Sequence, residues 1–155
     1  MRALTLLVGS VLLAACGDGT VSMTFIATDT VRATLSATAT RCPAGKGWLL
    51  EGADSALTVL IWLPSDTAAT WVPRSSGPAD RPRVVVQRLA RASIDTWLAD
   101  SGAVTLRDAA RGQAGDFSVF AGPQRASGGF RVPNPAPDTM ACVPRFPMRP
   151  LDSLP

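Results

Sequence analysis

The chain has 155 residues, no histidine, and a formal charge of +3 from 15 arginines and lysines against 12 aspartates and glutamates. Its length suits one domain, and the missing histidine excludes Ser-His-Asp and Cys-His catalysis and the usual histidine-based metal sites. The positive charges form no cluster interleaved with aromatic residues, so we expect no nucleic-acid partner. We also expect no bound metal and no cofactor.

The first segment combines a positive start at Arg2 with a short apolar run that ends in small residues, Leu13-Ala14-Ala15-Cys16. The run is shorter than the roughly 20 residues that span a bilayer as a helix. A short apolar run before small residues is typical of a signal peptide, which we place at residues 1–15.

The Leu13-Ala14-Ala15-Cys16 motif resembles the lipobox of bacterial lipoprotein signal peptides, and the resemblance covers only this segment. It implies that Cys16 becomes a diacylglyceryl-modified N-terminus, and that lipid anchors the mature protein in the cell envelope. Asp18 lies one place beyond the position of the plasma-membrane retention signal of these lipoproteins. We therefore expect the periplasmic side of the outer membrane in a bacterium with two membranes, and otherwise the outer face of the plasma membrane. The alternative is an ordinary secretory signal with a chance cysteine.

After a short tether at residues 16–20, residues 21–132 carry the pattern of a β domain. Residues 21–25 and 31–40 alternate apolar and polar side chains, as half-buried strands do. Residues 56–63 are apolar on both faces apart from one threonine, which predicts a central buried strand that ends at Pro64. Further short strands are expected at residues 48–50, 71–73 (an edge piece) and 83–89.

Residues 88–99 fit two patterns, because their apolar positions match both helical spacing and strand alternation. Three short strands at residues 103–107, 116–121 and 128–132 predict a meander. The expected fold class is therefore all-β, a small antiparallel sandwich or barrel, with one short helix near residues 88–99 as an open alternative.

Seven of the last 23 residues are proline, so residues 133–155 are expected to form neither a helix nor a central strand. With Cys16 lipidated, Cys42 and Cys142 remain, and an even pair in an exported chain predicts a disulfide bond. That bond pins the proline-rich segment to the domain as a strap. The alternative is two free buried thiols.

Three tryptophans, Trp48, Trp62 and Trp71, are candidates for an aromatic platform that binds sugar rings or a small apolar molecule. The alternative is that they pack in the core, although Trp62 is the best candidate for exposure because it alternates with the apolar residues of its strand. Gly45-Lys46-Gly47 lacks the spacing of a phosphate loop and is predicted to be a turn.

Four carboxylates, Asp95, Asp100, Asp108 and Asp116, have no spacing that enforces a glycosidase pair or a calcium site, and solvated turns are the expectation. The sequence therefore favours a membrane-anchored, non-catalytic module that contacts an envelope protein or glycan. A ligand-binding module that uses the tryptophans is the first alternative, and a carboxylate-based glycan hydrolase is the second.

Overall fold

The computed structural model describes residues 19–42, 47–75, 81–90, 93–108 and 112–137, which form eleven strands and no helix. The all-β prediction is confirmed. The strands are β1 (Gly19–Ile26), β2 (Thr30–Arg41), β3 (Trp48–Ala53), β4 (Leu57–Leu63), β5 (Ala69–Trp71), β6 (Arg83–Ala90), β7 (Ser93–Leu98), β8 (Ser101–Asp108), β9 (Gln113–Ala121), β10 (Gln124–Val132) and β11 (Ala136–Pro137).

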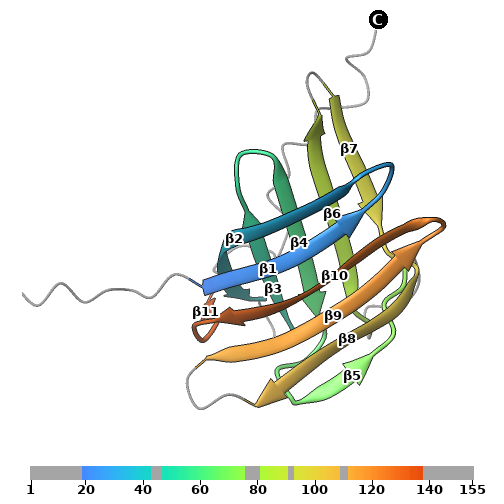
Figure 1. Cartoon of the computed structure of the whole chain (residues 1–155). Helices are drawn as coiled ribbons and strands as arrows, with labels where there is room; N and C mark the ends of the chain where they lie inside the picture. The colour runs from blue at the N-terminus through green and yellow to red at the C-terminus, as the bar shows by residue number, and fades with distance from the viewer. Residues whose placement is uncertain (1–18, 43–46, 76–80, 91–92, 109–111, 138–155) are drawn as a thin grey trace, which may run out of the picture.

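The strands form one continuous sheet in the order β5-β8-β9-β10-β1-β2-β3-β4-β6-β7, with every neighbouring pair antiparallel (Figure 1). The short strand β11 pairs with the end of β2 in parallel. The predicted meander is confirmed, because β8, β9 and β10 are neighbours in chain order. Its strands are longer than predicted, and only a two-residue turn separates β9 from β10.

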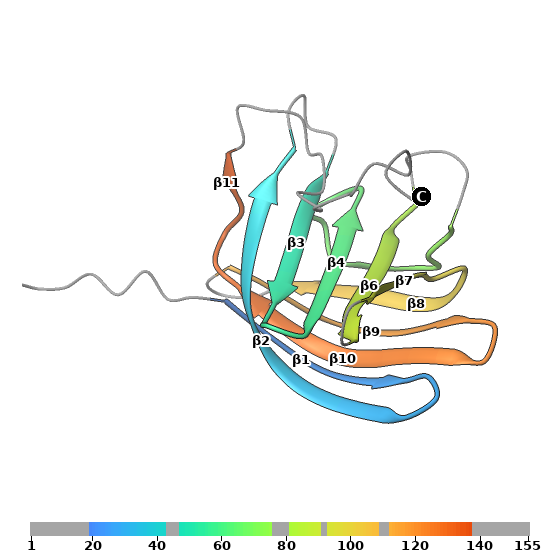
Figure 2. The same cartoon turned by 90° about the horizontal axis from the view of Figure 1, so that it is seen from above.

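The long strand β2 lets the sheet curl on itself. Residues 30–37 of β2 pair with β1, whereas residues 36–41 pair with β3. Figure 2 shows β2 curving from one group of strands to the other. We call β5, β8, β9, β10, β1 and the start of β2 the front half, and the end of β2 with β3, β4, β6 and β7 the back half. The front strands cross the back strands steeply in Figure 1.

The core lies between the two halves, because each long strand turns alternate apolar residues toward the other half. Two aromatic contacts join the halves: Phe25 on β1 meets Trp97 on β7, with ring centroids 5.6 Å apart, and Trp48 on β3 meets Phe130 on β10 at 6.3 Å. Both pairs are edge-on, the arrangement that aromatic quadrupoles favour. These contacts fix how the two halves face each other.

Strand β4 is the buried central strand that the sequence predicts, with five of its seven residues buried. The alternative of a short helix near residues 88–99 is wrong, because residues 88–90 belong to β6 and residues 93–98 to β7, and these two strands pair antiparallel. Trp97 is buried while its neighbour Leu98 is exposed, so the two residues face opposite sides, as strand alternation requires and helical spacing does not.

Several predictions lie outside the described residues: the signal peptide, Cys16 and most of the tether, Gly45 and Lys46 of the predicted turn, Cys142, and most of the strap. Among the described residues no helix is long and apolar enough to cross a membrane.

Candidate functional site

The three candidate tryptophans do not come together on one face. Trp48 is 1% exposed in the core, and its indole N–H donates a hydrogen bond to the Ser65 carbonyl oxygen at 3.1 Å. Trp62 is half-buried and lies on the outer face of the back half, away from the core, as the alternation of its strand predicts. Trp71 is half-buried on β5, at the far end of the sheet order. The structure therefore contains no platform shared by all three.

Cys42 follows the last residue of β2, is 5% exposed, and is disulfide-bonded. The cysteine bonded to it lies outside the described residues, so the pairing with Cys142 stays a prediction. Strand β11 places Pro137 beside Arg41, directly before Cys42 in the chain. Cys142 follows Pro137 by five positions in the sequence, a separation that a short loop can bridge.

The four candidate carboxylates lie at exposed or half-exposed positions. Asp116 on β9 forms an ion pair with Arg107 on β8, and Asp95, Asp100 and Asp108 are exposed. Within the described ranges, no three histidine, cysteine, aspartate or glutamate side chains form a group that could hold a metal ion.

The first surface with functional potential is the outer face of the β6–β7 hairpin, which we call the apolar face. Leu89 and Ile94 are paired across the two strands and are each 51% exposed. Leu98, at 37% exposed, is paired with the half-buried Val85. All four side chains point away from the core, because the alternating residues Val86 and Trp97 are buried.

Strand β7 ends the sheet, so no described strand pairs with its outer edge. The other end strand, β5, has only three residues and is followed by Pro73 two positions later. Short length and proline are ways in which proteins block an edge against further pairing. β7 has six residues, contains no proline and has Asp95 as its one charged residue, so its edge lacks the short length and the proline that block β5.

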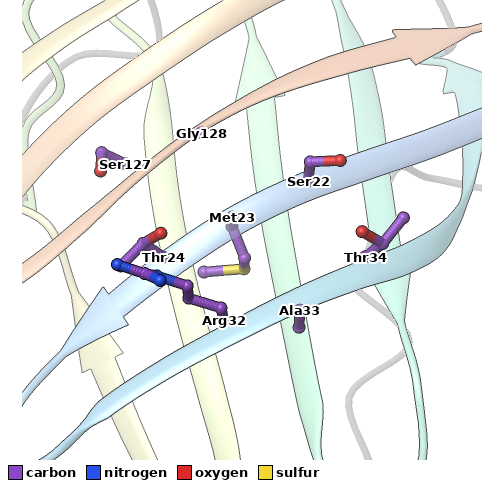
Figure 3. A pocket seen from close by; sticks show the side chains of 8 residues that line it. All are labelled: Ser22, Met23, Thr24, Arg32, Ala33, Thr34, Ser127 and Gly128. Atoms are coloured by element: carbon purple, nitrogen blue, oxygen red, sulfur yellow. The ribbon is translucent and has the colours of Figure 1, made fainter.

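The second surface is the outer face of the front half, which we call the polar face. A shallow open groove of about 510 Å³ crosses β10, β1 and β2 on this half (Figure 3). Thr24 lies at its centre, paired with Ser127 on one side and Arg32 on the other, and Ser22 is paired with Thr34. The groove thus offers hydroxyl groups and one guanidinium group, which can bind polar or anionic groups.

One ion pair joins the tips of the two halves. Asp29, in the turn between β1 and β2, accepts hydrogen bonds of 2.5 and 2.8 Å from the Arg88 guanidinium on β6. These hydrogen bonds hold the pKa of Asp29 below its ordinary value of 3.8. The pair is exposed, so solvent screens its contribution to stability.

Sequence reasoning did not identify the apolar face. The signal was present, because Ile94, Thr96 and Leu98 alternate with Trp97, but their exposure depends on β7 being the last strand of the sheet. Comparisons with protein-family models, with curated proteins and with solved structures found no match to this chain.

Proposed function

We propose that this protein is a lipid-anchored, non-catalytic module of the cell envelope that contacts another envelope protein through the β6–β7 hairpin. The lipobox-like segment that ends at Cys16 supports the anchor, and the absence of histidine supports a non-catalytic role. The contact mode is strand addition, in which the partner contributes an extended segment beside β7 and places side chains against the apolar face.

One observation carries the proposal. Within the described part of the chain, three of the five exposed large hydrophobic side chains lie on this one hairpin: Leu89, Ile94 and Leu98. They share a face and adjoin an edge that no described strand covers. Grouped apolar side chains beside the end strand of a sheet are typical of a protein-binding surface.

A photoactivated cross-linker at Thr96, between Ile94 and Leu98 on the apolar face, tests the contact in intact cells. We expect one discrete protein adduct from position 96, and none from Ser118, an exposed residue on the outer face of β9. Equal adduct patterns from both positions would contradict the proposal.

A matched pair of substitutions makes this test specific. Ile94→Asp places a charge in the apolar face and should abolish the adduct from position 96. Ile26→Asp introduces the same change at an exposed isoleucine of the front half, 40% exposed, and should leave the adduct intact. An adduct that survives Ile94→Asp in a folded protein would overturn the hairpin as the contact surface.

The anchor has an independent test. Cys16→Ser should block lipid attachment, release the protein from the membrane fraction or stop its processing, and remove the diacylglyceryl mass from its N-terminal peptide. A variant that is processed and sedimented with membranes like the wild type would exclude Cys16 as the anchor.

Glycan binding is a second candidate, and the hydroxyl-lined groove around Thr24 favours it over the separated tryptophans. Titration of the protein with neutral and acidic polysaccharides, with Arg32→Ala as the comparison, tests this candidate. Saturable binding that Arg32→Ala weakens would identify glycan binding in the groove as the function.

A further inference from the structure

The polar face carries an excess of positive charge. Outward-facing positions of β8, β9, β10, β1 and β2 in this half hold four arginines and one acidic residue. These arginines are Arg32, Arg107, Arg125 and Arg131. The acidic residue is Asp116, which forms an ion pair with Arg107.

The other three arginines are exposed and form no ion pair with a carboxylate among the described residues. Arg125 lies 5.6 Å from the ring centroid of Phe120, a contact that leaves its charge in place. The polar face therefore carries three positive charges that no described side chain neutralises, and most of the side chains around them are small hydroxyl groups.

The expected anchor is close in sequence to this surface. Cys16 precedes Gly19, the first residue of β1, by three residues, which span at most about 10 Å even when fully extended. Thr20, the next residue of β1, is paired with Arg131 on β10. Paired residues of antiparallel strands lie about 5 Å apart. A lipid attached to Cys16 would hold Arg131 within a short distance of the bilayer surface.

We propose that the polar face docks on the anionic phospholipid headgroups of the membrane that holds the anchor. This inference rests on the proposed lipid anchor and names the orientation that the anchor gives the domain. Arg32, Arg125 and Arg131 are attracted to the headgroups, and the serines and threonines around them can donate hydrogen bonds to phosphate oxygens. The apolar face belongs to the opposite half of the curled sheet and is left accessible to a partner protein.

Vesicle binding tests this docking independently of the lipid anchor. The mature chain, residues 16–155 with Cys16→Ser, retains every described strand and lacks acyl chains. It is mixed with vesicles of phosphatidylcholine containing 30% phosphatidylglycerol, or of phosphatidylcholine alone, at low salt. We expect binding only to the anionic vesicles, and loss of that binding as salt is raised.

Two charge-matched variants locate the binding surface. Arg125→Gln with Arg131→Gln should weaken vesicle binding by about 25-fold, because each arginine near an anionic surface contributes roughly a fivefold factor. Arg41→Gln with Arg83→Gln removes the same charge from the back half and should change binding by less than about twofold. Both variants should retain the circular dichroism spectrum of the parent.

Three outcomes would overturn the docking. They are equal binding to both kinds of vesicle, equal loss in both double variants, and absence of binding to anionic vesicles at low salt. None of them bears on the proposed function, because lipid attachment at Cys16 and the adduct from Thr96 are measured separately.

Discussion

The two halves of the sheet share the same inward pattern and differ on their outer faces. The front half presents serine, threonine and arginine outward, whereas the β6–β7 hairpin of the back half presents Leu89, Ile94 and Leu98. Because alternate residues of a strand point to opposite faces, the core fixes only every second position. The outer positions are then free to differ, and here they separate a polar, cationic surface from an apolar one.

Loss of the predicted disulfide bond at the end of β2, the strand that joins the two halves, should cause the largest loss of stability. Strand β2 belongs to both halves and ends next to Cys42, so the predicted bond to Cys142 closes a ring that spans most of the domain. Cys142→Ser should lower the free energy of unfolding by about 4 kcal/mol, as chain entropy gives for a ring of this size. Denaturant unfolding measures the loss, and an unchanged midpoint in oxidised protein would refute the pairing.

The two faces of β7 should respond very differently to truncation. Trp97→Ala removes a buried ring that meets Phe25 of the front half, and it should cost about 3 kcal/mol or more. Ile94→Ala, three residues earlier on the exposed face, should change stability by less than about 0.5 kcal/mol. Thermal unfolding of both variants measures the contrast, and similar losses would show that the apolar face is part of the core.

Neighbouring glycines on β10 sharpen the comparison from the front half. A Cβ atom at Gly128 would lie 2.1 Å from the Ser22 carbonyl oxygen, whereas one at Gly129 would have its nearest neighbour at 3.5 Å. Gly128→Ala should therefore destabilise the protein by about 2 kcal/mol, and Gly129→Ala by less than about 0.5 kcal/mol. Chemical denaturation measures both losses, and equal effects would contradict the close approach of β10 to β1.

The smallest expected effect concerns the exposed pair that joins the two halves. Because Arg88 holds the pKa of Asp29 below 3.8, the pair stabilises the fold above that value, and its contribution is lost as the pH falls through the lowered pKa. The difference in stability between wild type and Asp29→Asn should be larger at pH 7 than at pH 3. A difference that does not change with pH would show that the ion pair contributes nothing.

The sequence predicted most strands because their side-chain alternation is local. The patterns at residues 31–40 and 56–63 correspond to β2 and β4, and Trp62 lies opposite the inward residues of its strand, as expected. The helix at residues 88–99 was a wrong alternative, since a short apolar stretch fits both periods and pairing with β6 decides between them.

The surfaces could not be predicted in the same way. The exposure of Ile94 depends on β7 being the last strand of the sheet. The grouping of arginines on the polar face depends on which strands lie next to β1, β9 and β10. Both are properties of strand order, which a single sequence does not encode locally. Trp48 shows the same limit, because its burial results from packing against Phe130, 82 residues away in the chain.

The central claim is that lipid at Cys16 holds the polar face toward the bilayer and leaves the apolar face free. The most direct measurement places a nitroxide label at Ser127→Cys or at Thr96→Cys, both exposed positions, in the lipidated protein bound to vesicles. Lipids carrying chelated nickel on their headgroups then relax any label that lies near the membrane surface. We predict strong relaxation at position 127 and weak relaxation at position 96, whereas equal relaxation, or stronger relaxation at position 96, would contradict the account.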